Sequence, residues 1–277
     1  MSEQDVPNSE PAQRAAISVD PLTVCGLALL LMPLLTMWHE QVGHAGTCLA
    51  TGGQLVATSA FYVDCHSLGA AASRLVSVAG PLADLLGALV AYGIWKRVRG
   101  DLARLVWWYV WIDLAFTASG YLLFSGVLGL GDLAPGEEGG LGQLPYPEAI
   151  RIGSSLTGGF AYFLIVKLGI ATLSQMIGKG PETRKARRTI AHLFYGMVAV
   201  AALIASLPNP AGLFITLASA GAANIGGRAG FVSIGYATRP GEARGFVVTR
   251  SWPIFALGAL ATAIFAVVLG PTIKFTK

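Results

Sequence analysis

The chain has 277 residues, of which 54% are hydrophobic and only 12% are charged. A soluble domain of this size usually carries about twice that share of charge, so the composition excludes an ordinary soluble domain. The formal net charge of +4 is modest and falls between the apolar runs, which argues against nucleic acid as a partner. Several apolar runs reach the roughly 20 residues that a helix needs to cross a bilayer. We therefore predict an all-α polytopic membrane protein, embedded in a lipid bilayer, with about 6–7 transmembrane helices.

Residues 1–20 are polar and predict a disordered tail, residues 21–270 a single transmembrane domain, and residues 271–277 a short C-terminal tail. The expected spans are 21–50, 68–95, 105–130, 152–177, 190–207, 211–236 and 252–269. The sixth is interrupted by Asn224, Gly226, Gly227 and Arg228.

One segment after the first span breaks the helical pattern. Residues 55–63 follow Gly52 and Gly53 and are rich in β-forming residues. They predict a short strand or re-entrant hairpin, which at membrane depth must be shielded by protein or line a wet cavity. The three cysteines, Cys25, Cys48 and Cys65, contain no CxxC pair and predict no disulfide framework.

The basic residues predict the orientation, because lysine and arginine concentrate in cytoplasmic loops. They follow the second, fourth and sixth spans: Lys96, Arg97, Arg99 and Arg104, then Lys179, Arg184, Lys185, Arg187 and Arg188, then Arg239, Arg244 and Arg250. This alternation places the N-terminus in the cytoplasm. With no organelle address recognised, a bacterial inner membrane is the expected location.

The first span ends in the run WHEQVGHA, at residues 38–45. Ionisable groups cost about 2.5–3.5 kcal/mol at the bilayer centre, so two imidazoles and a carboxylate in this run indicate function. In the zinc-protease signature H-E-x-x-H, two histidines one turn apart bind the metal and the glutamate acts as general base. Here one extra residue separates His39 from His44. The ordinary alternative is a pair of interfacial histidines that face water.

The extra residue changes the geometry of the pair. Side chains at i and i+4 point about 40° apart around a regular helix, whereas those at i and i+5 point about 140° apart, too wide for one metal. A single-turn π-bulge would bring the two histidine side chains back onto one face of the helix. Gly43 would ease that distortion of the backbone. Alternatively, Glu40 and His44, already at i,i+4, form the metal pair.

The membrane orientation predicted from the basic loops also groups the candidate ligands. It brings toward the outer face of the membrane His39, His44, Cys65, His66 and Asp132.

The run HEQVGHA, the pair Gly52-Gly53 with the short strand, and the stretch AGPLAD at 79–84 resemble the site-2 protease family of intramembrane zinc metalloproteases. The order and spacing match across roughly residues 25–95. The resemblance implies one Zn²⁺ per chain, held by His39 and His44, with Glu40 as general base. It also implies that the strand near 55–63, including Phe61 and Tyr62, binds substrate.

Two positions depart from the family pattern. Asp84 replaces an asparagine that helps to position substrate, and a carboxylate cannot donate a hydrogen bond as an amide can. The family's third ligand, an aspartate in a later Pro-Leu-Asp-Gly stretch, has no counterpart here. We expect Asp132, among glycines after the third span, to supply it, although an ordinary acidic loop residue would look the same in the sequence. Asp113 is expected to be a buried polar contact or a group that supports a ligand. Cys65 or His66 is the alternative ligand.

The predicted function is zinc-dependent endopeptidase activity on a membrane-spanning or membrane-adjacent peptide, through metal-activated water. One alternative is a non-proteolytic regulatory or binding protein on the same scaffold. Another is a transporter whose polar path includes Asp113, Asp132 and the histidines.

Overall fold

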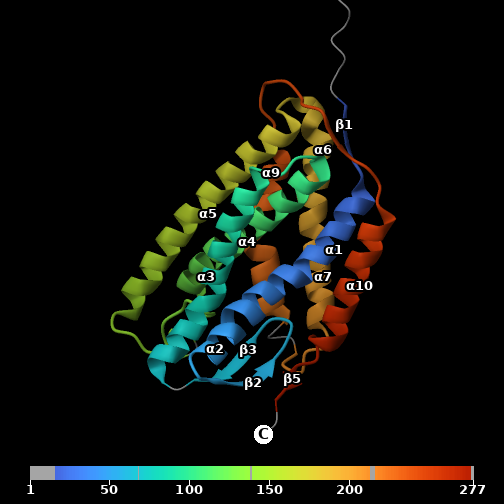
Figure 1. Cartoon of the computed structure of the whole chain (residues 1–277). Helices are drawn as coiled ribbons and strands as arrows, with labels where there is room; N and C mark the ends of the chain where they lie inside the picture. Colours follow the sequence, from blue (N-terminus) through green and yellow to red (C-terminus); the bar gives the residue numbers. More distant parts are fainter. Residues whose placement is uncertain (1–15, 68, 138, 213–215, 276–277) are drawn as a thin grey trace, which may run out of the picture.

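The computed structural model describes residues 16–67, 69–137, 139–212 and 216–275. Among these residues, five helical stretches are long and apolar enough to cross a membrane, and they stand side by side as a bundle (Figure 1). They are Pro21–Ala50, α3 (Ala70–Trp95), α4 (Asp101–Leu128), α5 (Pro147–Ile177) and Pro181–Ser206. The prediction of an all-α polytopic membrane protein is confirmed.

Two of these stretches are composite helices. Pro21–Ala50 consists of α1 (Pro21–Met37), the π-helix η1 (Trp38–Ala45) and α2 (Gly46–Ala50). Pro181–Ser206 consists of the 3-10 turn η2 (Pro181–Thr183), α6 (Arg184–Arg188), the π-helix η3 (Thr189–Leu193) and α7 (Phe194–Ser206). The π-helical segment η1 contains both histidines of the first span.

The described part of the chain makes two more passages through the bundle. One consists of η4 (Thr216–Gly226) and α9 (Gly230–Tyr236), and the other is α10 (Trp252–Val268). The break between η4 and α9 falls at the predicted interruption around Gly227. α10 packs closely on α1, since a Cβ added to Gly26 would lie only 2.6 Å from the Cα of Phe255. Close approach at small residues is the usual way in which helices associate in lipid.

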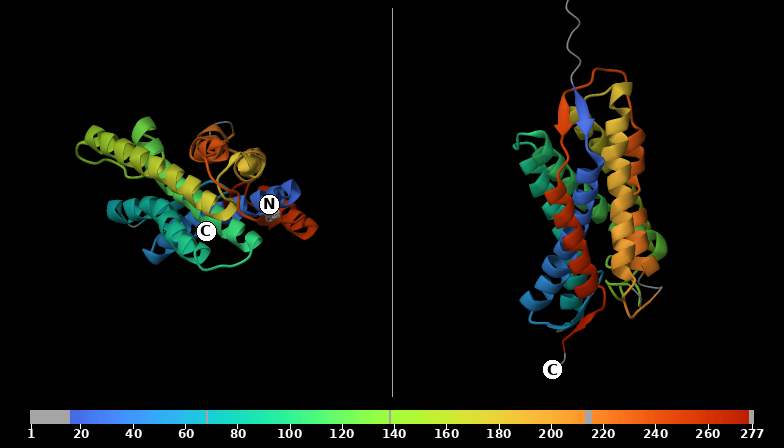
Figure 2. Two further views of the ribbon diagram at one scale, coloured as in Figure 1. Left: turned by 90° about the horizontal axis from the view of Figure 1, so that it is seen from above. Right: turned by 90° about the vertical axis from the view of Figure 1, so that its right-hand side faces the viewer.

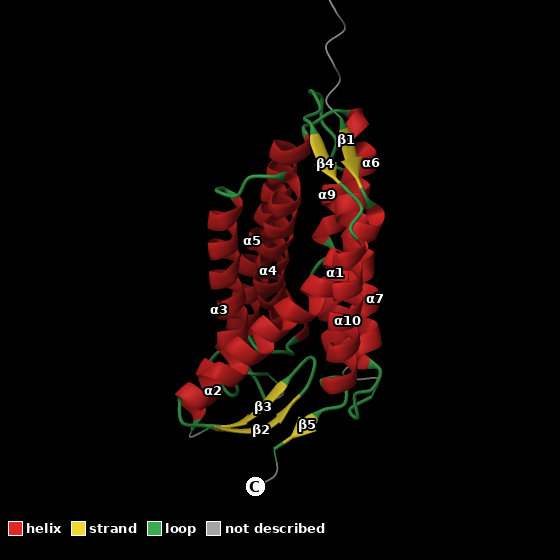
Figure 3. Cartoon of the chain, turned by 45° about the vertical axis from the view of Figure 1, so that its right-hand side comes forward, coloured by secondary structure: helices red, strands yellow, loops and turns green. Residues whose placement is uncertain are grey.

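A short parallel sheet lies at one end of the bundle (Figure 3). It pairs β1 (Ile17–Val19) with β4 (Phe246–Val248). Residues 17–19 are therefore part of the folded domain, and the prediction of a disordered tail to residue 20 is wrong for them. The strand depends on a partner more than 200 residues later in the chain, which local composition does not reveal. Residues 1–15 of the predicted tail lie outside the described residues.

A second sheet lies at the opposite end of the bundle (Figure 2). Its strands are β2 (Gln54–Thr58), β3 (Val63–His66) and β5 (Ile273–Lys274), in the order β3-β2-β5. Both pairings are antiparallel. The hairpin predicted near 55–63 is confirmed. Residues 273–274, predicted to be tail, instead pair with β2, while residues 276–277 lie outside the described residues.

A disulfide joins Cys48 at the end of the first helical stretch to Cys65 on β3. The cysteine spacing, which predicted no disulfide framework, did not reveal this bond, because the pairing depends on the hairpin folding back over α2 and not on a sequence motif. Gly53 makes room for the bond, since a Cβ there would lie 3.0 Å from the Sγ atoms of both cysteines. The disulfide ties the hairpin to the helix that contains His44.

Replacing Cys48 and Cys65 together with serine should destabilise the protein. The bridged residues are 17 apart, and closing a loop of about that length contributes about 3 kcal/mol through the entropy of the unfolded chain. The midpoint of thermal unfolding in detergent should fall in the double variant and not in the control Cys25→Ser, which removes the free cysteine. Alkylation of all three thiols in the unreduced, denatured wild type would contradict the pairing.

Candidate metal centre

The π-helix η1 brings the two histidines of the first span together. In a π-helix the backbone bonds run from i to i+5, so side chains five apart fall on one face. His39 and His44 are both buried, and their Nε2 atoms lie 3.1 Å apart. The predicted distortion is therefore present, and it is the two histidines that pair. The alternative, in which Glu40 pairs with His44 in a regular helix, does not describe this segment.

Close packing against α3 accompanies the distortion. A Cβ added to Gly43 would lie 2.6 Å from the Cα of Gly80, so the two backbones approach as only glycines allow. Gly80 in turn lies directly beneath the imidazoles. A Cβ there would lie 2.6 Å from the Nε2 of His39 and against the Nε2 of His44. The glycine of the AGPLAD stretch thus leaves space where the two imidazoles converge.

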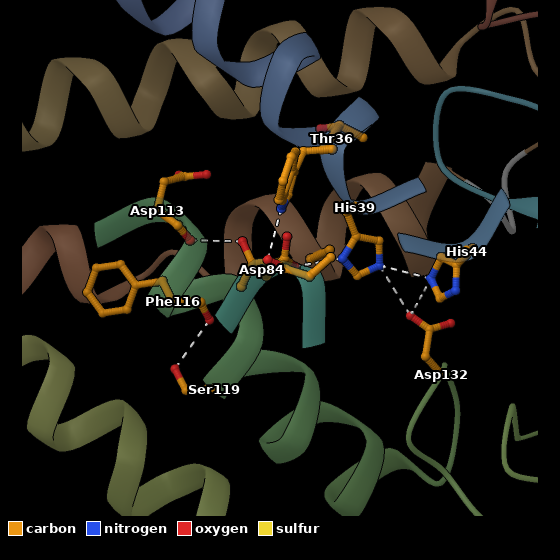
Figure 4. A network of polar contacts seen from close by, with 12 residues as sticks. Thr36, His39, His44, Asp84, Asp113, Phe116, Ser119 and Asp132 are labelled. Carbon is orange, nitrogen blue, oxygen red and sulfur yellow. Dashed lines mark hydrogen bonds and ion pairs between the residues drawn. The ribbon is translucent and has the colours of Figure 1, made fainter. Parts of the chain in front are cut away.

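Asp132 completes a triangle of ligand atoms with the two histidines (Figure 4). Its Oδ2 lies 3.3 Å from the Nε2 of His39 and 3.3 Å from the Nε2 of His44. Ligands about 2.0–2.1 Å from a tetrahedral zinc ion lie about 3.3–3.4 Å from one another. The observed edges of 3.1, 3.3 and 3.3 Å match that spacing. The residues present therefore fit a zinc-sized cation with three protein ligands.

The hydrogen bonds on the far side of each imidazole fix where its lone pair points. His44 Nδ1 lies 2.7 Å from the backbone carbonyl of Val76, which only accepts, so Nδ1 donates and Nε2 keeps its lone pair. His39 Nδ1 lies 2.6 Å from Oδ2 of Asp84 and donates in the same way. Two lone pairs and the carboxylate of Asp132 thus converge without a donor between them. A cation is the partner that satisfies three converging acceptors.

The loop after α4 places the Asp132 carboxylate. Gly129 ends α4 with φ of 71° and Gly131 follows with φ of 89°, left-handed conformations that glycine adopts without strain. Ser77 and Arg74 on α3 then hold the loop by donating to the carbonyls of Gly140 and of residues 141 and 143. The expectation that glycines let this segment curl toward the histidines is confirmed.

The Asp132 carboxylate, which follows the third long helix, remains ionised in this setting. Burial by itself raises its pKa, but without a metal the imidazoles of His39 and His44 take up a second proton at Nε2, and their hydrogen bonds and positive charge outweigh burial and hold the pKa of Asp132 below its usual range. A bound cation takes the place of those protons. A charged carboxylate is the form that binds a metal.

Asp84 on α3 holds a histidine by a hydrogen bond and does not border the cavity. Its side chain is completely buried, its Oδ2 accepts from His39 Nδ1, and its Oδ1 has no partner within the described residues. It does not border the cavity beside the triangle. The expected role of Asp84 in substrate binding is therefore replaced by a role in positioning His39, of the kind that carboxylates play behind metal-binding histidines.

Asp84→Ala should weaken metal binding at this centre about 10–100-fold, with zinc as the probe ion, the usual effect of removing a carboxylate that orients a ligand histidine. Competition with a chromophoric zinc chelator measures this change. Asp64→Ala is the matched control, since Asp64 is an exposed aspartate on β3 at the same end of the molecule. Equal zinc affinity in wild type and Asp84→Ala would show that the hydrogen bond to His39 contributes nothing to the metal centre.

The remaining candidate ligands lie elsewhere. Cys65 is consumed by its disulfide and His66 is exposed, so the alternative that one of them completes the metal site is not supported. Asp113 is buried and accepts two hydrogen bonds from Arg228, at 2.6 Å from Nε and 2.8 Å from Nη2. It is the buried polar contact that was predicted. Arg228, the residue expected only to interrupt the sixth span, proves to be its partner.

A cavity of about 470 Å³ opens beside the triangle of ligand atoms. Glu40, His44 and Asp132 line it, and so do the predicted substrate residues Phe61 and Tyr62. The Glu40 side chain is only 5% exposed, and its carboxylate has no hydrogen-bond partner in the part of the chain that the structure describes. A buried carboxylate without a partner beside three converging ligand atoms is free to bind a water molecule or a proton.

Two features of this site were not predicted from the sequence. The first is the role of Asp84, which a carboxylate within one helix turn of Gly80 in the AGPLAD stretch could have suggested. The second is Tyr121, whose ring stacks on that of His39 with 4.8 Å between centroids and 22° between planes. No spacing pattern marks Tyr121, since it reaches the site from α4, far from the HEQVGHA run.

Comparison with known proteins adds no relative to this picture. No protein-family model, no curated protein and no solved structure matches the chain.

Proposed function

We propose that this protein is a zinc-dependent intramembrane endopeptidase of the site-2 protease type, which hydrolyses a membrane-spanning or membrane-adjacent peptide. One observation carries the proposal. The ligand atoms of His39, His44 and Asp132 converge at the wall of a cavity that the buried, unpartnered carboxylate of Glu40 also lines. Three ligands with an open position and an adjacent base are the parts that a zinc hydrolase requires.

The role of each group in the site follows from its chemistry. When bound, a zinc ion supplies Lewis-acid polarisation of the peptide carbonyl and activation of water. Asp84 and the Val76 carbonyl hold the two imidazoles in the tautomer that leaves Nε2 free. The Glu40 carboxylate accepts a proton from the attacking water and returns it to the nitrogen of the leaving amine.

The substrate peptide is proposed to add to β3. The strand expected to pair with substrate, β2, has β3 along one edge and β5 along the other. Within the described sheet, β3 is an outer strand whose second edge is unpaired, and Val63 at its start lines the cavity together with Phe61 and Tyr62. An unpaired edge offers its backbone groups to an extended peptide, and extended backbone is the form in which a peptide bond is open to attack.

We place the N-terminus in the cytoplasm and the metal centre near the opposite face, in a bacterial inner membrane. The three basic loops support this orientation. The disulfide between Cys48 and Cys65 supports it independently, because it lies at the end with the hairpin and such bonds persist in oxidising compartments. Thiol trapping in intact cells tests the assignment: a fully reduced pair would contradict it.

The test of the proposed activity uses the full chain in lipid vesicles with a pool of single-span peptides that carry a helix-breaking residue within the span. The expected result is new peptide fragments, found by mass spectrometry, whose formation stops on zinc removal by a chelator and resumes on zinc addition. A zinc-loaded protein that cleaves none of these peptides would favour the non-proteolytic alternative. The transporter alternative loses support, since Asp113 is engaged by Arg228 rather than open to a path.

A further inference from the structure

We propose that Tyr121 is a catalytic residue whose phenol donates a hydrogen bond to the carbonyl oxygen of the scissile peptide bond as that oxygen becomes negative. This inference rests on the proposed endopeptidase function and adds a residue to it. The polar side chains of the HEQVGHA and AGPLAD stretches do not supply this donor. Glu40 and Asp84 are carboxylates, and His39 and His44 aim their lone pairs at the metal position. The amide of Gln41 already donates to Thr58 Oγ1 at 2.7 Å.

Tyr121 lies at the wall of the cavity, next to a histidine of the ligand triangle. It lies on α4 and lines the same cavity as Glu40, His44 and Asp132. Its ring stacks on the ring of His39 at 4.8 Å between centroids, so the phenol is held beside the ligand triangle by a buried neighbour. A stacked, packed aromatic ring presents its hydroxyl with little loss of entropy on substrate binding, which is the condition for effective electrostatic stabilisation.

The other hydroxyl groups that line the cavity are already engaged. Ser77 Oγ donates to the carbonyl of Gly140 at 2.7 Å. Thr117 Oγ1 donates to the carbonyl of Asp113 at 2.9 Å. The hydroxyl of Tyr62 pairs with Thr272 Oγ1 at 2.7 Å. Among the described residues that line the cavity, Tyr121 is left as the side-chain hydroxyl without a hydrogen-bond partner.

The chemistry of the site requires such a donor. Attack of water on a peptide carbonyl converts a neutral oxygen into an oxyanion, and preorganised donors aimed at that oxygen lower the barrier. The cavity wall otherwise presents the carboxylates of Glu40 and Asp132, which repel a developing negative charge. A phenol is protonated at neutral pH, so Tyr121 donates a hydrogen bond and keeps its proton throughout.

Tyr121→Phe tests the inference, because it removes one oxygen and keeps the ring that stacks on His39. The value of kcat for a peptide that the wild type cleaves should fall about 10²–10³-fold, as when one oxyanion donor is removed. KM, zinc content and the midpoint of thermal unfolding should stay at their wild-type values. Tyr146→Phe is the matched control: its side chain is exposed and does not line the cavity, and its kcat should stay close to wild type.

A second readout does not depend on turnover. A phosphinic peptide carries a tetrahedral anionic centre like that of the hydrolytic intermediate, and it should bind zinc-loaded Tyr121→Phe about tenfold more weakly than wild type, as expected for a lost charge-assisted hydrogen bond. Wild-type kcat in Tyr121→Phe would overturn the role of Tyr121 while leaving the endopeptidase function intact. If the wild type cleaves no peptide, the proposed function fails, and equal phosphinic-peptide affinity in the two proteins overturns the inference separately.

Discussion

Glu40→Gln should retain one zinc ion per chain and cleave peptides about 10²–10⁴-fold more slowly than wild type, the range attributed to general acid–base catalysis. The substitution preserves the size and polarity of the side chain, but an amide cannot accept the proton of the attacking water. Glu40 is the group to test because its buried carboxylate lines the cavity beside His44 without belonging to the triangle of ligand atoms. Metal content by mass spectrometry and initial rates of fragment formation measure the two effects.

Glu137→Gln is the matched control for this experiment. Glu137 is an exposed glutamate on the loop that follows Asp132, so the same chemical change is made outside the cavity. Its cleavage rate should equal that of the wild type. Persistence of the wild-type rate in Glu40→Gln would show that Glu40 is not the base. Loss of zinc in Glu40→Gln would show instead that the carboxylate contributes to metal binding.

Gly80→Ala should abolish zinc binding although it adds a single methyl group. The new Cβ would lie 2.6 Å from Nε2 of His39 and against Nε2 of His44, in the space where the two lone pairs converge. The Nδ1 atom of each imidazole makes a hydrogen bond, His39 to Asp84 and His44 to the carbonyl of Val76. The imidazoles therefore cannot move away from the new methyl group without losing a buried hydrogen bond. Zinc content after purification should fall from about one ion per chain to background.

Gly93→Ala provides the control on the same helix. A Cβ at Gly93 would meet nothing closer than Arg97 Nη1 at 3.5 Å, an ordinary contact with a flexible side chain. Alanine has a higher helix propensity than glycine, so neither substitution is expected to weaken α3 through its backbone. Full zinc occupancy in Gly80→Ala would mean that the histidines do not converge above Gly80, and the proposed metal centre would be wrong.

The fold was largely predictable because membrane spans are encoded locally, as continuous apolar runs of sufficient length. The π-helical turn was predictable for a different reason. Once His39 and His44 were assumed to share one metal, an insertion of one residue left few ways to bring them onto one face. Asp132 was predictable from loop charges, which placed it on the side of the histidines, and from its flanking glycines.

The features that were missed depend on contacts between distant segments. The strands β1 and β5 exist only because residues far along the chain pair with them, and the bond between Cys48 and Cys65 exists only because the hairpin folds over α2. Asp84 was expected to contact substrate by analogy with an asparagine. In the structure its carboxylate turns toward His39, an orientation fixed by the packing of α3 against η1, which the sequence does not specify.

The most direct test of the account is the metal content of the full-length protein, purified from cells grown with added zinc. We expect near one zinc ion per chain in the wild type and near none in His39→Ala and His44→Ala. Full occupancy is expected in His66→Ala, which removes an exposed histidine from the same end of the molecule. A wild-type protein without zinc, or one that holds iron in its place, would contradict the central claim.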